Sequence, residues 1–508
     1  MDAAYGTMTR EIKRLLIANR GEIALRIIRC CREMGIEAVA VYSDADRAAR
    51  HVRAADYAVR IGPAPAVDSY LNVAAVLEAA RATRADAVHP GYGFLSENAE
   101  FARACTTQGF LFVGPPAEAI ARMGSKIAAR DLMERAGVPL VPGRTPEDQT
   151  PRGIAAAARD VGFPLLVKAS AGGGGKGMRF VHESGGMDEA IQGARREALA
   201  AFGDGTLYLE RVIARPRHIE VQVFADEAGE VVHLFERECS LQRRHQKIVE
   251  ESPSPAVTET VRRQMGSAAV TAARSVGYRS AGTVEFLLEG EGENARFYFL
   301  EMNTRLQVEH PVTEAVTGTD LVRAQLLIAM GCPLPWRQED LAQRGHAIEC
   351  RVYAEDPAND FLPQAGPLRL YREPAGPGIR IDSGVEEGAE VPLQYDPMLA
   401  KLIAAADTRE HAVSRARAAL RTFPVLGVRT NIPFLISLLD HPAFRSGAVH
   451  TRFVEEHLED LLAPDVPSDA AFAAAAVAAA HETHAVRSGT VNLAITADPW
   501  DLLRGWRH

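Results

Sequence analysis

The stretch IKRLLIANRGEIALRIIRCCREMG, residues 12–35, shows how the first part of the chain folds. Residues 12–18 form a short apolar run that predicts a strand, and residues 21–35 follow with a helical pattern. Three further apolar runs, AVAVY, DAVH and FLFVG, come before residue 120 with helical patterns between them. Such alternation of strands and helices favours a parallel, doubly wound sheet. The sequence therefore predicts an α/β fold here.

Two polar segments stand where strands of this sheet are expected to end. Residues 19–22 (Asn-Arg-Gly-Glu) follow the first strand, and residues 89–93 (His-Pro-Gly-Tyr-Gly) follow a later one. Ligands of doubly wound sheets bind at the carboxyl ends of the strands. Both segments also have the composition of tight turns that lead into helices. The sequence leaves the ligand role and the turn role equally open.

Length and composition limit the class of protein. A chain of 508 residues, 47% hydrophobic and 24% charged, is typical of a globular protein with several domains. The net charge of −9 argues against nucleic acid as a partner, and no apolar run is long enough to span a membrane. The six cysteines lack metal-binding spacing, and the first residues lack the pattern of a secretion signal. We expect a cytoplasmic protein.

The rest of the chain is expected to form further units. Residues 121–141 predict a connecting helix that carries Lys126, and the Pro-rich segment 142–153 predicts a hinge. A small α/β unit should follow, with a helix at 154–161, strands at 165–169 and 178–182, and a helix that ends near residue 202. Strands dominate from residue 207, and a second large unit runs to about 460. The alanine-rich run 469–482 favours a helix.

A glycine-rich loop, AGGGGKG at 171–177, separates the two strands of the small unit. It fails the dinucleotide-binding fingerprint because a strand follows it where a helix is required. It also fails the Walker A pattern, because Gly177 follows Lys176 where Ser or Thr is required. A strand–loop–strand flap can close over phosphates through its backbone N–H groups, with Lys168 pointing at the same phosphates. The alternative is a flexible hairpin tip.

A second motif predicts a metal site. TVEFL at 283–287 and FYFLEMN at 297–303 are rich in β-forming residues and are joined by an acidic, glycine-containing loop, which indicates a hairpin. Glu301 and Asn303 share a strand face, and Glu285 joins them if the register of the two strands aligns. Carboxylate and amide oxygens suit Mg²⁺ or Mn²⁺. A solvated strand face is the alternative, although flanking Phe, Leu and Tyr residues argue against it.

Two charged clusters complete the candidate site. Arg305, Gln307 and Glu309 alternate at two-residue spacing directly after the hairpin. Arg305 can hold a carboxylate-like anion, and Glu309 can act as a general base. The segment QRRHQK, residues 242–247, places three cations and a histidine beside a strand. Each cluster alone is more typical of a solvated face, but their combination favours an anion site.

Six segments resemble the biotin carboxylase family, a branch of the ATP-grasp enzymes. They are IANRGEIALRI, HPGYGFLSEN, KASAGGGGKGM, ECSLQRRHQK, EMNTRLQVEHPVTE and GHAIECRVYAEDP, and the resemblance covers roughly residues 10–460. It implies a Rossmann-like pre-ATP-grasp domain over 10–120 and an ATP-grasp domain over 121–330, with a mobile glycine-rich lid at about 142–205. A C-terminal biotin carboxylase domain of α+β type would span 340–460. Residues 461–508 would be an Ala-rich helix and the truncated start of a linking domain.

The resemblance also implies roles for individual residues. The ATP site would comprise Lys126, Lys168, Gly174, Gly175, Glu210, Arg211, Ile213, His218, Gln242, His245, Glu285 and Glu301. Glu285, Glu301 and Asn303 would hold Mg²⁺ or Mn²⁺. Bicarbonate would bind Lys247, Arg305, Gln307 and Val308, with Glu309 as general base and Arg351 as stabiliser of the biotin enolate. Arg26, Arg29 and Glu33 match positions of the family's dimer contact.

The implied activity is the ATP-dependent carboxylation of biotin with bicarbonate through carboxyphosphate, the first half-reaction of an acyl-CoA carboxylase. No Met-Lys-Met segment with a biotinyl lysine occurs in the chain, so biotin would be presented by a carrier protein or domain. A carboxyltransferase (beta) subunit would complete the cycle, in a homodimer or larger complex. The acyl-CoA acceptor stays open among the acetyl, propionyl and methylcrotonyl types.

Two other functions remain open from the residues alone. The chain could be another ATP-grasp ligase that joins a carboxylate to an amine, although RRHQK and NTRLQVEH are not expected in such enzymes. It could also be a non-catalytic ATP-binding subunit. The presence of Glu285, Glu301, Asn303, Arg305 and Glu309 together argues against that function.

Overall fold

The computed structural model describes residues 9–170 and 177–462. Gly174, Gly175 and the alanine-rich run 469–482 lie outside the described residues. Among the residues described, no helix combines the length and the apolar character needed to cross a bilayer.

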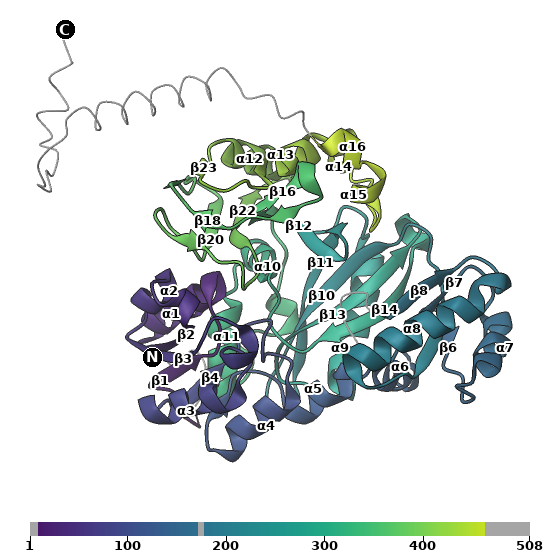
Figure 1. Ribbon diagram of the computed structural model, residues 1–508, viewed down its shortest axis with the longest axis horizontal. Helices are drawn as coiled ribbons and strands as arrows, with labels where there is room; N and C mark the ends of the chain where they lie inside the picture. The colour runs from purple at the N-terminus through teal and green to yellow at the C-terminus, as the bar shows by residue number, and fades with distance from the viewer. Residues whose placement is uncertain (1–8, 171–176, 463–508) are drawn as a thin grey trace, which may run out of the picture. The chain divides into compact units, whose positions relative to one another are not determined.

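The first sheet has the strand order β3-β2-β1-β4-β5 with parallel neighbours throughout, which confirms the doubly wound prediction. The strands are β1 (Arg14–Ile17), β2 (Glu37–Ser43), β3 (Tyr57–Gly62), β4 (Ala87–His89) and β5 (Leu111–Phe112). The helices of this part are α1 (Gly21–Met34), α2 (Arg50–Ala54), α3 (Val73–Thr83) and α4 (Ala99–Thr107) (Figure 1). The sequence missed β3, a half-exposed edge strand whose residues lack a continuous apolar run.

The prediction of one connecting helix over 121–141 is wrong. Two helices occupy the region, α5 (Ala117–Gly124) and α6 (Lys126–Arg135), and they meet at Ser125. The Ser125 backbone is extended, and its hydroxyl accepts a hydrogen bond from the backbone N–H of Ala128. Serine in that position is a strong helix N-cap, so it starts a new helix within an otherwise helical pattern. Lys126 is therefore the first residue of α6.

The small α/β unit is present with the predicted hairpin. Its sheet has the order β6-β9-β7-β8, formed by β6 (Gly143–Arg144), β7 (Leu165–Ala169), β8 (Met178–Val181) and β9 (Leu207–Arg211). β7 and β8 pair antiparallel on either side of the glycine loop. Two helices, α7 (Pro151–Val161) and α8 (Met187–Phe202), contribute to the core of this unit. α7 begins earlier than predicted, because Thr150 caps it and Pro151 fits its first turn.

An eight-stranded antiparallel sheet forms the largest layer, in the order β14-β13-β10-β11-β12-β15-β22-β20. Its strands are β10 (Arg217–Ala225), β11 (Val231–Arg243), β12 (Gln246–Ser252), β13 (Ser280–Glu289), β14 (Arg296–Asn303), β15 (His346–Tyr353), β20 (Ile379–Ser383) and β22 (Met398–Ala406). Pairing of β12 with β15 carries the sheet from the segments before residue 330 into those after residue 340. The sequence did not indicate this continuity, and the domain bounds stay a prediction.

Helices and short strands complete the described chain. The remaining helices are α9 (Glu259–Ser275), α10 (His310–Thr317), α11 (Leu321–Ala329), α12 (Arg409–Arg421), α13 (Ile432–Asp440), α14 (Pro442–Arg445), α15 (Phe453–Glu456) and α16 (Leu458–Leu461). Short strands are β16 (Glu355–Asp356), β17 (Leu362–Pro363), β18 (Gly366–Pro367), β19 (Leu370–Tyr371), β21 (Glu390–Val391) and β23 (Val425–Leu426). Single 3-10 turns lie at Asp44–Asp46, Ala66–Asp68, Ser184–Gly186, Gly292–Asn294, Gln338–Asp340 and Pro357–Asn359.

Phe286 anchors the large sheet to the helix α9 beneath it. Its ring is fully buried in a core shared with α9 and stacks edge-on against Phe297 at 5.4 Å between centroids. Phe286→Ala should destabilise the protein by about 3–5 kcal/mol, because a buried ring leaves a cavity that the sheet cannot close. Thermal and urea unfolding would measure the loss. Phe180→Ala, at a ring that is 47% exposed on β8, should change stability by less than about 0.5 kcal/mol. Equal losses would contradict the prediction.

Candidate active site

A tight turn between β11 and β12 starts the site. Arg243 pairs with Gln246, and the two residues between them, Arg244 and His245, both have positive φ, at 49° and 68°. That is the backbone of a two-residue hairpin turn, which matches the twist of the strands it joins. The turn sends the chain back along β12, from which the Lys247 side chain reaches past β11 to Glu220 of β10 and Glu285 of β13.

The predicted residues gather around one cavity of about 640 Å³. Those that line it are Lys126, Lys168, His218, Gln242, His245, Lys247, Glu285, Glu301, Asn303, Arg305, Gln307, Val308, Glu309 and Arg351. They come from α6, β7, six strands of the large sheet (β10 to β15), the β11–β12 turn and the segment after β14. The structure therefore brings the three clusters of the sequence together with Lys126, Lys168 and Arg351, so that the lining residues span more than two hundred positions of the chain.

Lys247 stands at the centre of the charges. Its Nζ lies 2.5 Å from Glu220 Oε2, 2.8 Å from Glu285 Oε1 and 2.7 Å from Glu309 Oε1. Burial works against the ammonium charge, but the three carboxylates outweigh it and raise the pKa of Lys247 well above its usual value. The lysine therefore stays protonated and binds three acids at once.

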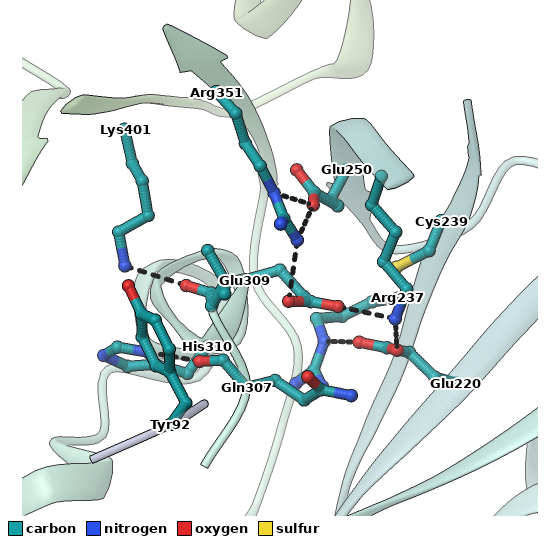
Figure 2. A network of polar contacts seen from close by, with 12 residues as sticks. Tyr92, Glu220, Arg237, Cys239, Glu250, Gln307, Glu309, His310, Arg351 and Lys401 are labelled. Carbon is teal, nitrogen blue, oxygen red and sulfur yellow. Dashed lines mark hydrogen bonds and ion pairs between the residues drawn. The ribbon is translucent and has the colours of Figure 1, made fainter. Parts of the chain in front are cut away.

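Glu309 lies between two cations. Its Oε1 accepts from Lys247, and its Oε2 accepts from Arg351 at 3.0 Å. Burial alone would raise the pKa of Glu309, but Lys247 and Arg351 outweigh burial and hold the pKa well below its usual value. Figure 2 shows Arg351 reaching both Glu250 and Glu309. For Glu250 burial prevails over Arg351 and raises the pKa to about 7.

The metal hairpin has the predicted register. Glu285 on β13 pairs with Glu301 on β14, and Thr283 pairs with Asn303. The Asn303 amide donates to Glu285 Oε1 at 2.8 Å. Enclosure by the site and the nearby Glu285 carboxylate raise the pKa of Glu301, and Lys126 at 3.8 Å only partly offsets them. Two opposed carboxylates beside an amide oxygen fit a divalent cation, which would relieve their repulsion.

The two-residue alternation of Arg305, Gln307 and Glu309 does not arise from a strand. β14 ends at Asn303, and residues 304–309 form an irregular connection to α10, where Pro311 occupies the first turn. The three side chains still reach the cavity. Arg305 donates to Gln307 Oε1 at 2.6 Å and to Glu97 Oε2 at 2.8 Å.

Three residues expected at the adenine lie outside the lining of this cavity. Glu210 accepts from Lys168 at 2.5 Å and from Arg130 at 2.9 Å. Arg211 donates to Glu289 at 3.0 Å, and Ile213 packs in a small core beside these residues. Their roles stay predictions from the resemblance, as do those of Gly174 and Gly175.

Sequence reasoning missed several residues of the charge network. Glu220, Arg237 and Glu250 are buried, and Arg237 donates to Glu220 at 2.5 Å. Arg237 also reaches Gln222 and Thr283, so that its guanidinium holds β11 to β10 and β13. The available signal was the alternation of charged and apolar residues along β10 and β11, in strands that are buried on both faces.

A second cavity of about 480 Å³ adjoins the first. Residues 19–23 and Tyr92 line it from the carboxyl ends of β1 and β4, and Tyr395 and Asp396 line it from the C-terminal part. It shares Gln246, Arg305, Val308 and Arg351 with the first cavity. The two polar segments that the sequence left open are therefore parts of a cavity wall.

The residues matched to a dimer contact divide into two kinds. Arg26 is buried, and its guanidinium donates to Glu314 at 3.0 Å and to Asp320 at 2.7 Å within the chain. Arg29 and Glu33, further along α1, are exposed.

This arrangement is that of an ATP-dependent ligase of the ATP-grasp class, with the β7–β8 hairpin beside a cavity that is lined by cations and by the acidic β13–β14 hairpin. Residues 11–120 match the biotin carboxylase N-terminal domain, and residues 349–456 match the biotin carboxylase C-terminal domain. Residues 125–337 match the ATP-binding domain of the carbamoyl-phosphate synthase L chain. The chain belongs to the biotin carboxylase family, whose members use ATP, magnesium and biotin on a carrier.

Known proteins of two lengths resemble the chain. It is 52% identical to the biotin carboxylase of Halalkalibacterium halodurans, over 88% of the chain and 98% of that protein. It is 50% identical to the mitochondrial methylcrotonoyl-CoA carboxylase subunit alpha of Rattus norvegicus, over 90% of the chain and 64% of that protein. The chain thus spans about two thirds of the longer relatives.

Solved structures agree with these matches. The biotin carboxylase domain dimer of Hydrogenobacter thermophilus 2-oxoglutarate carboxylase, in complex with MgADP, ADP and bicarbonate, has a TM-score of 0.85 at 46% identity, covering 89% of this chain and 99% of that one. The biotin carboxylase of Campylobacter jejuni, in a β-γ-ATP complex, has a TM-score of 0.85 at 44% identity, covering 88% and 99%. The predicted fold and the predicted family are confirmed.

Glu301→Gln should weaken divalent-cation binding by roughly tenfold or more, because it removes a charged oxygen from the hairpin set. Mn²⁺ titration in the presence of ADP, followed by electron paramagnetic resonance, would measure the affinity. Glu291→Gln, in the exposed loop of the same hairpin, removes the same charge without reaching the site and should leave the affinity unchanged. Unchanged Mn²⁺ affinity in Glu301→Gln would rule out Glu301 as a ligand.

Proposed function

We propose that this chain activates bicarbonate with ATP and transfers the carboxyl group to biotin, with the residues of the two cavities in the roles given below. The observation that carries the proposal is the position of Glu309. Its carboxylate is held between Lys247 and Arg351, and Arg351 belongs to the walls of both cavities. A base in that position can take a proton from an anion in the first cavity. It also contacts Arg351, which lines the second cavity.

ATP would occupy the first cavity beside the β7–β8 hairpin. Lys126 and Lys168 would contact the phosphates together with Gly174 and Gly175, and Glu210, Arg211 and Ile213 would contact the adenine. His218, Gln242 and His245 would lie near the ribose and phosphates. Glu285, Glu301 and Asn303 would hold the divalent cation, which neutralises charge on the phosphates during transfer.

Bicarbonate would bind where cations converge, at Lys247, Arg305, Gln307 and the backbone of Val308. An anion that enters here competes with Glu309 for Lys247. Loss of that contact raises the basicity of Glu309, because Lys247 is one of the two cations that hold its pKa down. Glu309 would then take the bicarbonate proton as the bicarbonate oxygen attacks the γ-phosphorus, the bond to the bridging oxygen breaks and ADP leaves, which gives carboxyphosphate. The base is therefore activated by the substrate it acts on.

Biotin would enter through the second cavity. Arg351 reaches that cavity as well as the first, and it would stabilise the negative charge that develops on the ureido oxygen. Its guanidinium is fixed by Glu250, with a hydrogen bond of 2.6 Å from Nε. A cation that is already oriented needs no reorganisation when the charge appears.

Partners follow from the same proposal. A carrier protein or domain would present the biotin, and a carboxyltransferase subunit would pass the carboxyl group to an acyl-CoA. The relative from Hydrogenobacter thermophilus is a dimer, and we extend a homodimer to this chain with Arg29 and Glu33 of α1 as contacts. Six buried cysteines, none in a disulfide, support a cytoplasmic location.

ATP hydrolysis by the purified chain should depend on bicarbonate and should rise when free biotin is added. Hydrolysis should depend on bicarbonate because bicarbonate is the nucleophile that attacks ATP. It should rise with biotin because biotin takes the carboxyl group of carboxyphosphate. Phosphate release, measured with each component omitted in turn, tests this. Turnover that ignores bicarbonate would contradict the proposal. Stimulation by amines in place of biotin would instead favour a carboxylate–amine ligase.

Glu309→Gln should lower bicarbonate-dependent turnover by roughly a hundredfold or more, the usual loss when a general base is removed. ATP affinity should stay within about twofold, because Lys247 keeps Glu220 and Glu285 as partners. Steady-state kinetics measure the bicarbonate-dependent turnover, and nucleotide titration measures the ATP affinity. Glu236→Gln is the matched control, since Glu236 is equally buried and pairs with Arg262 outside the cavity. A comparable loss of ATP affinity in Glu309→Gln would make Glu309 structural.

A further inference from the structure

Lys401 is a buried cation that none of the roles above uses. It lies on β22, directly opposite Arg351 of β15, so the two cations share one face of the large sheet. Its side chain is fully buried. Adjacent like charges on a sheet are unfavourable, and a buried lysine costs several kcal/mol unless it is paired. Its position therefore calls for specific partners.

Those partners come from three distant parts of the chain. Lys401 Nζ donates to the backbone carbonyl of Val308 at 2.8 Å. It lies 3.2 Å from Glu22 Oε1 in the first turn of α1 and 4.0 Å from Asp382 of β20. Tyr92 donates to Glu22, and its ring centroid lies 6.0 Å from the ammonium. Figure 2 shows Lys401 and Tyr92 on the opposite side of Glu309 from Glu220.

The Val308 carbonyl belongs to a segment that lacks the regular hydrogen bonds of a strand or a helix. Residues 304–309 are neither strand nor helix, and several of their backbone groups bond to side chains. Glu97 accepts from the backbone N–H of Thr304 at 3.2 Å, and the His310 ring donates to the carbonyl of Gln307 at 2.8 Å. Lys401 makes a further contact of this kind, to the carbonyl of Val308, the residue directly before Glu309.

A charged donor at that point determines where the anion-binding groups stand. Arg305 and Gln307 precede Val308, and Glu309 follows it, so a shift of the Val308 peptide moves all of them. Val308 also lines both cavities. An apolar residue of similar volume would fill the same space at lower desolvation cost, but it would leave the carbonyl without its donor.

We propose that Lys401 is a positioning residue for the bicarbonate site, which holds the 304–309 segment in place through the Val308 carbonyl while Glu22 and Asp382 hold Lys401. Lys401 lines neither of the two cavities. The expected change in the KM for bicarbonate rests on the proposed function. The contact between Lys401 and the Val308 carbonyl can be tested without any measurement of activity.

Lys401→Met removes the donor and keeps most of the volume. The KM for bicarbonate should rise about tenfold or more, as expected when a charge-assisted hydrogen bond is lost, while the KM for ATP stays within about twofold. Lys401→Arg keeps a donor but displaces it, and should raise the bicarbonate KM about threefold. If Lys401→Met does not fold, the Lys401→Arg result decides the proposal in the same way.

Arg409→Met is the matched control. Arg409 pairs with the buried Glu251 at 2.6 Å, outside both cavities, so its loss also removes a cation from a buried carboxylate. It should lower the melting temperature without changing the bicarbonate KM. A Lys401 variant whose bicarbonate KM equals that of wild type, or whose two KM values rise together as melting temperature falls, would overturn the proposal.

Hydrogen–deuterium exchange separates this inference from the proposed function. Peptides that cover residues 304–309 should exchange faster in Lys401→Met than in wild type, and Arg409→Met should leave them unchanged. Unaltered exchange in Lys401→Met would overturn the positioning role even if the enzyme is active. A wild-type protein without bicarbonate-dependent turnover would overturn the proposed function, while faster exchange would still support the contact.

Discussion

The contact between Glu309 and its two cations is the interaction on which the site depends. Lys247 and Arg351 hold one carboxylate from opposite sides, and each has further acids as partners. In a dry interior none of these charges is stable alone, since an unpaired buried ion costs several kcal/mol. The buried charges of the network therefore stabilise one another only when all of them are present. A substrate anion can enter it because the cations are already present and ionised.

The continuous eight-stranded sheet makes that balance possible. Lys247 lies on β12 and Arg351 on β15, and these adjacent strands join segments that the sequence assigned to separate domains. Strand pairing fixes the separation of side chains to a few tenths of an ångström, which loops between mobile domains would not do. The base itself comes from an irregular segment. Its position relative to the sheet must be set by side chains, and Lys401 on β22 provides one such contact.

Much of this could be predicted from the sequence where a local pattern carries the information. The strand–helix alternation predicted the parallel sheet, and the hairpin pattern predicted that Glu301 and Asn303 share a strand face, whereas the register that places Glu285 opposite Glu301 came from the structure. Other features depend on contacts between distant residues. The break at Ser125 lies within a continuous helical pattern, and the β12–β15 pairing joins strands almost a hundred residues apart. Glu220 and Arg237 look like ordinary strand charges until the sheet places them beside Lys247.

The sharing of Arg351 between the two cavities has a consequence for the order of events. While Arg351 is bound to Glu309, its charge is largely neutralised and attracts a second anion weakly. Once Glu309 takes a proton, its carboxyl becomes neutral and Arg351 keeps Glu250 as its ion-pair partner. Arg351 then presents more positive charge to the second cavity. Proton transfer from bicarbonate to Glu309 in the first cavity thus makes the charge of Arg351 available to the biotin anion expected in the second cavity. The sheet does not have to move.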